Sequence, residues 1–421
     1  MSLASFPATM SIDDEPVWLA ALRDRGRQAL ASAAVPGPKD EDWKYVDIDF
    51  GLDDFRPAPE PSGALGGDEY LEALGERSGG LTMVDGAVVD VEAGEIEVHR
   101  AADVPDGRVA SLYGSMATPD VDVFAAANHA MAPPGAVVTI PARRVVSAPV
   151  VVDIQAVAAG SVSFPHLTVV AGPDSEASVV VLYRSAPGEE LLVSPILETL
   201  VDRGARLSIS VVQNLSEPAR MVAHHQYVTE RDSTLRIGEV GLGGLYARQR
   251  LGISLAGSGS SVQMGGIYFG DGAQVLDYRI HVAHRGPRTT SDIFLKGAVA
   301  DNARAVWTGL MRIEKGAVGT SAFETNRNLV LSDGAKVNSV PNLEILTDDL
   351  QCGHGSSSGP LDEQQLYYLM SRGLPRNPAE RLLVRGFFNE ILSGLTVPGL
   401  AAPSRRAVAA KFAGAQQRAA S

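Results

Sequence analysis

The residues with the clearest chemical potential are Cys352 and His354, which lie two positions apart in the stretch QCGHGSSSG at residues 351–359. Cys352 is the only cysteine of the 421-residue chain. On an extended segment, side chains at positions i and i+2 point to one face, so this thiolate and imidazole could share a borderline metal such as iron or zinc. A tetrahedral metal needs about four ligands, so other ligands would have to come from elsewhere, including another chain.

Two other interpretations of this pair stay open. Cys352 could be a nucleophile with His354 as its base, although the sequence fixes neither their hydrogen bond nor an orienting third group. A hydrolase or lyase could instead use Cys352 with the neighbouring acids Asp348 and Asp349. In the third interpretation Cys352 is a buried thiol beside a turn, and the chain has a purely structural role.

Composition limits the partners and the compartment. The chain has 36 basic and 50 acidic residues, a net charge of −14, and shows no basic patch, which opposes binding to nucleic acids and anionic membranes. One cysteine cannot form an internal disulfide, the N-terminus lacks the layout of a secretory signal, and no apolar stretch reaches the roughly 20 residues that span a bilayer. We therefore expect a cytoplasmic protein without nucleic-acid or membrane contacts. The P-loop pattern is absent too, which opposes nucleotide hydrolysis of that type.

Residues 111–350 are predicted to form a β-solenoid core. Segments such as ASVVVLYRS, RLSISVVQ and QVLDYRIHVAH are rich in β-branched residues and are typical of strands. Eight similar turns precede new strands, and their matched positions are Ser175, Ala205, Ser233, Ser260, Ala273, Ala303, Ala317 and Ala335. Spacings near 30 residues, with half-steps, indicate coils that bury their faces by stacking on one another. A β-sandwich is the alternative, because its strands also follow one another at short intervals.

Helical regions are expected on both sides of this core. Residues 1–110 are predicted to form an N-terminal helical or mixed domain with a linker, in which EPVWLAALRDRGRQALASAA is a helix and DWKYVDI a compact apolar cluster. Residues 351–421 are predicted to form a C-terminal helical domain. There LDEQQLYYLMSRG and PAERLLVRGFFNEILSGL have the apolar spacing and end signals of two amphipathic helices.

The stretch DDLQCGHGSSSGPLDEQQLYYLMSRG, with the GFF helix that follows, resembles the C-terminal signature of the SufB/SufD family of iron–sulfur cluster assembly proteins. In that signature a histidine-containing turn leads into D-x-x-Q-L-x-Y-L-x-S-R-G. The resemblance continues through ETNRNLVLSDGAKVNSVPNLEIL and reaches DWKYVDI. The C-G-H-G element and the W-K-Y segment are similar to the SufD branch, whereas the SufB branch has a cysteine just before the V-P-x-x-E stretch, and residues 335–344 contain none.

This resemblance implies a mainly β chain with a right-handed parallel β-helix flanked by helical regions. It also implies a heterodimer with a SufB-like subunit and a SufC-like ABC-type ATPase docked on the C-terminal helices; whether the chain homodimerises alone is open. ATP hydrolysis would belong to the ATPase, so the chain would be a scaffold and not an enzyme. His354, assisted by Cys352, would be a ligand of iron or of a transient cluster shared with the SufB-like subunit, with none held tightly by the isolated chain. The candidate docking residues are Leu382, Leu383, Phe387, Phe388 and Ile391.

Overall fold

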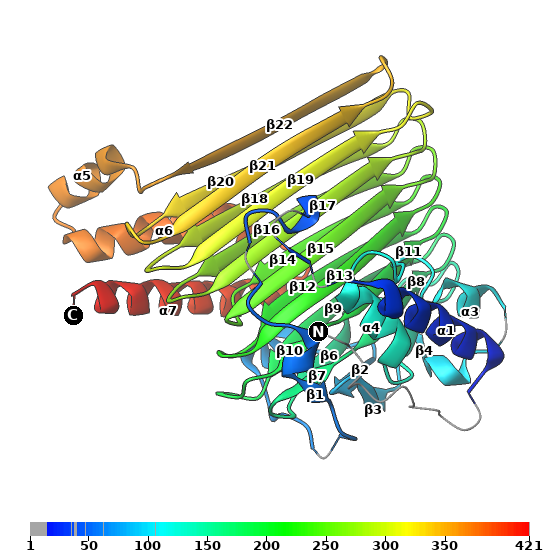
Figure 1. Ribbon diagram of the computed structural model, residues 1–421. Coiled ribbons are helices and arrows are strands. Elements are labelled where there is room, and N and C mark those ends of the chain that lie inside the picture. Colours follow the sequence, from blue (N-terminus) through cyan, green and yellow to red (C-terminus); the bar gives the residue numbers. More distant parts are fainter. Residues whose placement is uncertain are drawn as a thin grey trace.

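Two long β-sheets dominate the computed structural model (Figure 1). The structure describes residues 15–34, 36–37, 40–46, 48–61, 63–105 and 107–420. Within these residues the first sheet, sheet A, consists of β1 (Arg56–Pro57), β4 (Glu97–Arg100), β5 (Ala136–Ile140), β7 (Ser161–Ser163), β8 (His166–Ala171), β10 (Leu192–Val193), β11 (Ile196–Val201), β13 (Arg220–Thr229), β15 (Tyr246–Leu255), β17 (Val275–His284), β19 (Arg304–Ile313) and β21 (Lys336–Ile345). Sheet B consists of β2 (Gly80–Val84), β3 (Ala87–Glu92), β6 (Val150–Ala156), β9 (Glu176–Ser185), β12 (Arg206–Asn214), β14 (Thr234–Gly241), β16 (Ser261–Gly270), β18 (Thr290–Val299), β20 (Thr320–Val330) and β22 (Leu350–Gly359).

From β11 onward, successive long strands alternate between the two sheets, and each pairs in parallel with the strand one coil further on. In sheet B, for example, β12 pairs with β14 and β14 with β16, while in sheet A β13 pairs with β15 and β15 with β17. Each coil therefore contributes one strand to each sheet. The predicted β-helix, or solenoid, is confirmed, whereas a β-sandwich would bring antiparallel strands together.

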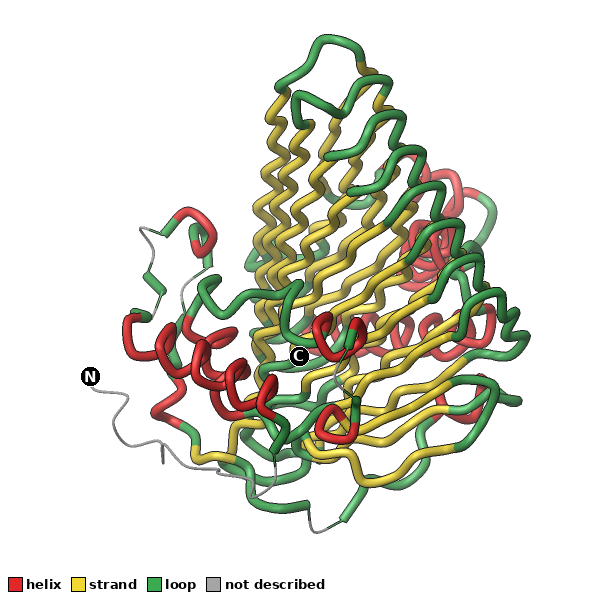
Figure 2. The backbone as a smooth tube through the Cα atoms, turned by 90° about the vertical axis from the view of Figure 1, so that its right-hand side faces the viewer, coloured by secondary structure: helices red, strands yellow, loops and turns green. Residues whose placement is uncertain are grey.

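The repeating turns are explained by this winding. Asp174, Gly204, Asp232 and Gly259 occupy one position in successive turns, and all four have left-handed backbone conformations with φ between 56° and 73°. The amide of each residue donates a hydrogen bond to a carbonyl in the next turn, so the turns stack in a column that Figure 2 shows as green loops along one edge. The half-step that leads to Ala273 arises because that residue belongs to the turns at the other junction of the sheets, ahead of β17.

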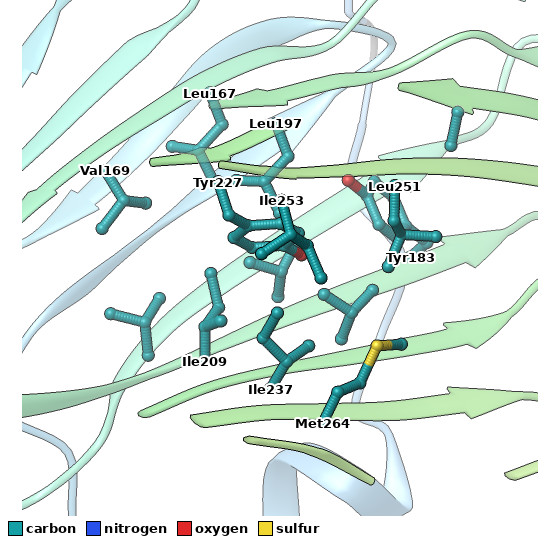
Figure 3. Close-up of a cluster of buried hydrophobic side chains, with 14 of the residues drawn as sticks. Leu167, Val169, Tyr183, Leu197, Ile209, Tyr227, Ile237, Leu251, Ile253 and Met264 are labelled. Atoms are coloured by element: carbon teal, nitrogen blue, oxygen red, sulfur yellow. The ribbon is translucent and has the colours of Figure 1, made fainter. Parts of the chain in front are cut away.

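The space between the sheets is filled by one continuous apolar core, part of which appears in Figure 3. Alternate residues of each strand point inward, so side chains at matching positions of successive coils form rows. One row in sheet B consists of Val179, Ile209, Ile237, Met264 and Ile293, all of which are buried. Full burial of such a side chain stabilises the fold by about 1.5–3 kcal/mol. Because each coil buries these side chains only by stacking on the next coil, the stability of one coil depends on its neighbours.

Most of the N-terminal elements cover the outer face of sheet A. They are α1 (Val17–Ser32), η2 (Glu41–Trp43), η3 (Leu52–Asp54), η4 (Ala101–Asp103), α3 (Arg108–Leu112) and α4 (Val123–Met131). The short helix α2 (Glu69–Leu74) lies instead on sheet B, where Tyr70 is buried. The DWKYVDI segment is held on sheet A by Arg248, whose guanidinium lies 3.9 Å from the centre of the Trp43 ring and donates to the Asp42 carbonyl. Trp43 is buried as expected, whereas Tyr45 is exposed.

The C-terminal helices are α5 (Glu363–Ser371), α6 (Arg376–Leu392), η5 (Pro398–Leu400) and α7 (Ala401–Ala420), so the two helices predicted in this region are confirmed. Helices α6 and α7 lie against the outer face of sheet B, whereas α5 contacts α6 and lies beyond the ends of the strands (Figure 1). None of the helices in the described part of the chain is both long and apolar enough to cross a bilayer.

The solenoid extends further in both directions than the sequence indicated. Three strands from the expected N-terminal domain belong to these sheets. In sheet B, β2 pairs with β6 and β3 with β2, and in sheet A, β4 pairs with β5. At the other end β22 crosses the expected boundary at residue 350 and adds a full strand beside β20. The expected core also contains two helices, α3 partly and α4 wholly.

Candidate functional site

The stretch QCGHGSSSG forms most of β22 and is therefore a strand, as the shared-metal interpretation requires, and not a turn. Its pairing with β20 places Cys352 beside Ala322, His354 beside Glu324 and Ser356 beside Asn326. The expected extended geometry of the cysteine and histidine is confirmed, so both side chains lie on the same face of the strand.

That face points into the solenoid. In β20, Ala322, Glu324 and Asn326 are buried while the intervening Phe323 is 46% exposed, so the even-numbered residues are the inward ones. In the described residues no strand pairs with the outer edge of β22, which forms the upper edge of the body in Figure 1. Cys352 consequently packs against the interior core while only half-buried, and the inward-facing His354 is exposed.

Glu324 is a candidate site residue that the sequence analysis missed. Its side chain is 1% exposed, and neither carboxylate oxygen has a hydrogen-bond partner among the described residues. Burial raises the pKa of this carboxyl to about 8. A Cβ atom at Gly309, on the opposite sheet, would lie 1.4 Å from Glu324 Oε1, so the carboxylate reaches across the interior to a space that only glycine leaves open. The acid could have been found from the sequence only if the inward face of β20 had been known.

The two sheets end at β21 and β22, beyond which no further strand pairs in the described residues, and we call this end of the solenoid the open end. The interior becomes polar in the coils next to it. Asn326 Oδ1 accepts hydrogen bonds from Asn328 Nδ2 at 2.6 Å and from Ser339 Oγ at 2.9 Å. Asn326 Nδ2 in turn donates to the Tyr268 hydroxyl at 3.1 Å. These bonds fix the side chains around Glu324, because a buried amide with satisfied partners is costly to move.

The metal and hydrolase interpretations can be placed on this geometry. In the part of the chain that the structure describes, no three His, Cys, Asp or Glu side chains are grouped so that they could hold a metal ion. Ligation by His354 and Cys352, completed by another chain, stays a prediction. Asp348 and Asp349 are exposed in the connection between β21 and β22.

The five candidate docking residues of α6 divide by burial. Phe388 and Ile391 are buried in this chain and pack on sheet B, with the ring of Phe388 stacked 6.1 Å from that of Phe269. Leu383 and Phe387 are half-buried, and Leu382 is 48% exposed. Only part of the set is therefore available to a partner.

A groove of about 550 Å³ lies between α6 and α7. Its apolar lining comprises Pro378, Leu382, Val384, Phe388, Leu392, Val408, Ala409 and Phe412, and its basic lining comprises Arg381, Arg385, Arg405 and Arg406. The preceding helix α5 exposes Tyr367, Tyr368 and Met370. Large apolar side chains that gather on a surface beside a groove are typical of protein interaction sites.

Comparison with known proteins agrees with this architecture. Residues 154–387 match the family model described as SUF system FeS cluster assembly, SufBD core domain. An iron–sulfur cluster assembly SufBD family protein of Mycobacterium bovis is 33% identical over 373 residues, which cover 86% of each chain. The iron–sulfur cluster assembly proteins SufD of Escherichia coli and Bacillus subtilis are both 30% identical, over 47% and 56% of this chain and 49% and 55% of their own lengths. The resemblance found in the sequence is confirmed, and this chain belongs to the SufBD family of iron–sulfur cluster assembly proteins.

Proposed function

We propose that this chain is the SufD-like scaffold subunit of a cytosolic complex that assembles iron–sulfur clusters and transfers them. In this proposal a SufB-like subunit binds the open end of the solenoid, and a SufC-like ABC-type ATPase binds the C-terminal helices. The observation that carries the proposal is the position of His354, which is exposed on the inward face of the last coil.

The open end has the properties of an interface with another solenoid. The outer edges of β21 and β22 leave backbone amides and carbonyls without a neighbouring strand in the described residues, and such edges pair readily with strands of other chains. Around them Phe323, Ile345 and Leu346 are each more than 40% exposed. A partner that covered this end would bury these apolar side chains together with His354 and Cys352.

At such an interface His354 would supply an imidazole to iron or to a nascent cluster, Cys352 could assist, and the partner would supply most of the thiolates. An imidazole in place of one thiolate changes the potential and the retention of a cluster, which suits a scaffold that must release its cargo. The cluster is cargo here, and the isolated chain is not expected to hold one tightly.

The ATPase would dock on the helices of the C-terminal region. The groove between α6 and α7 combines an apolar floor with four arginines, a lining that fits an acidic segment with apolar anchors. Because α6 packs directly on sheet B, a movement of the docked ATPase would be transmitted to the coils near the open end.

The proposal is tested by anaerobic co-purification of the chain with its SufB-like and ATPase partners, followed by iron, sulfide and absorbance analysis. His354→Ala should abolish most of the bound cluster while the complex stays assembled. His99→Ala is the matched control, because His99 is also exposed but lies on β4 at the far end of the solenoid. An unchanged cluster content in the His354 variant, within an intact complex, would leave the chain only a structural role.

A further inference from the structure

We infer that Glu324 and His354 together form a ferrous-iron site at the open end of the solenoid, with a carboxylate and an imidazole as the protein donors. The inference rests on the proposed function, because it specifies what the His354 site binds and names a second ligand. Glu324 lies outside the histidine and cysteine segment from which that function was argued.

The backbone brings the two residues to neighbouring positions. Glu324 and His354 are paired in the register of β20 and β22, and both lie on the inward face. Neighbouring strands are about 4.8 Å apart, and metal–ligand bonds to nitrogen and oxygen are about 2.0–2.2 Å long. Rotation of the glutamate side chain about its own bonds can therefore bring its carboxylate to an ion held by the imidazole, without a change in the strands.

The surroundings of Glu324 differ from those of a structural glutamate. Glu198 is equally buried, but its carboxylate accepts hydrogen bonds from the amides of Gly114, Met116 and Ala117 and from the Thr168 hydroxyl. Glu324 has no hydrogen-bond partner for either oxygen in the part of the chain that the structure describes. A buried carboxyl group without partners destabilises a fold, so its position beside the exposed histidine requires a reason other than stability.

A second interior acid shows what is special about this position. Glu239, in β14, is also fully buried, and its carboxylate has no hydrogen-bond partner within the described ranges of the chain. Its neighbours in the register are Val211 and Gly266, neither of which can bind a metal. Glu239 therefore shares the burial of Glu324 but not its adjacent imidazole, and it provides a matched control.

The donor chemistry favours ferrous iron as the ligand. Carboxylate with imidazole is a common donor set for non-haem Fe(II), whereas finished clusters prefer thiolates. Two protein donors leave most coordination positions to water or to a partner. Such a site suits iron that enters the assembly interface, since exchangeable ligands allow sulfide and partner thiolates to replace them.

The test is an anaerobic titration of the full-length chain with ferrous ammonium sulfate, followed by calorimetry, with Co²⁺ absorption as a second readout. We expect one ion per chain for the wild type and for Glu239→Gln. Glu324→Gln and His354→Ala should each weaken the dissociation constant by at least about tenfold, and Glu324→Asp should restore part of the affinity. Circular dichroism checks that each variant is folded.

The outcomes separate this inference from the proposed function. Iron binding by Glu324→Gln that equals the wild type, or no ferrous binding by the wild-type chain, overturns the inference. If His354→Ala still abolishes the cluster in the assembled complex, the proposed function stands without it. If His354→Ala keeps the cluster while both variants weaken ferrous binding, the site exists, and it is the role of His354 in cluster assembly that fails.

Discussion

Replacement of Glu324 by glutamine should stabilise the protein, and the gain should depend on pH. Burial raises the pKa of this carboxyl from the ordinary 4.5 to about 8, so the folded chain keeps a proton that the unfolded chain releases. Below pH 4.5 the group is neutral in both states and has no effect. As the pH rises from 4.5 towards 8 the unfolded state is progressively favoured, and the stability of the wild type falls.

The size of the effect follows from the two pKa values. At about 1.4 kcal/mol per pH unit, the interval between them corresponds to a penalty of roughly 4 kcal/mol at pH 8. Glutamine has nearly the same shape and does not ionise. The Glu324→Gln variant should therefore match the wild type near pH 4.5 and exceed its free energy of unfolding by up to that amount at pH 8.

The assay is urea unfolding of both proteins at several pH values, followed by circular dichroism. Peptide-level hydrogen exchange of β20, compared between the two proteins at the same pH, adds a local measurement, because the last coils of a solenoid can open before the rest. Glu97→Gln, which changes an exposed acid of β4, should show no such trend. A stability difference that stays constant between pH 5 and 8 would refute the argument that burial keeps Glu324 protonated.

Substitutions at two residues of α6 should affect different properties, the stability of the chain at Phe388 and the binding of the ATPase at Leu382. Phe388→Ala removes a fully buried ring that packs on sheet B, and it should lower the free energy of unfolding by about 3–5 kcal/mol in urea unfolding. Leu382→Arg changes a half-exposed side chain of the same helix; it should alter stability by less than about 0.5 kcal/mol while reducing ATPase retention in a pull-down at least tenfold. Full ATPase retention by the Leu382 variant would exclude this residue from the docking surface, and an unchanged unfolding curve for Phe388→Ala would contradict its place in the core.

Much of the fold was predictable from local patterns. The turns before Ser175, Ala205 and Ser233 revealed the solenoid, because each coil must reverse direction with the same few residues and must bury its face on its neighbours. The amphipathic helices α5 and α6 were likewise predictable from apolar spacing and end signals. Family membership was evident from the motif around His354 and the segments upstream of it.

The site depended on information that local patterns do not contain. The sequence left open whether the segment around His354 is extended or lies at a turn. Pairing with the complete row of backbone partners in β20 made QCGHGSSSG a strand. The burial of Phe388 and exposure of Leu382 were decided by which face of α6 meets sheet B.

The sequence by itself determined that this chain is a stack of β coils with a cysteine and a histidine near its end, since those features are written in repeats and short motifs. Only the tertiary structure decided that His354 stands beside Glu324, that Gly309 leaves room for the carboxylate, and that this end of the solenoid is open. The physical reason is that register between coils depends on hydrogen bonds between strands about 30 residues apart, and a shift of one residue would turn every side chain to the other face.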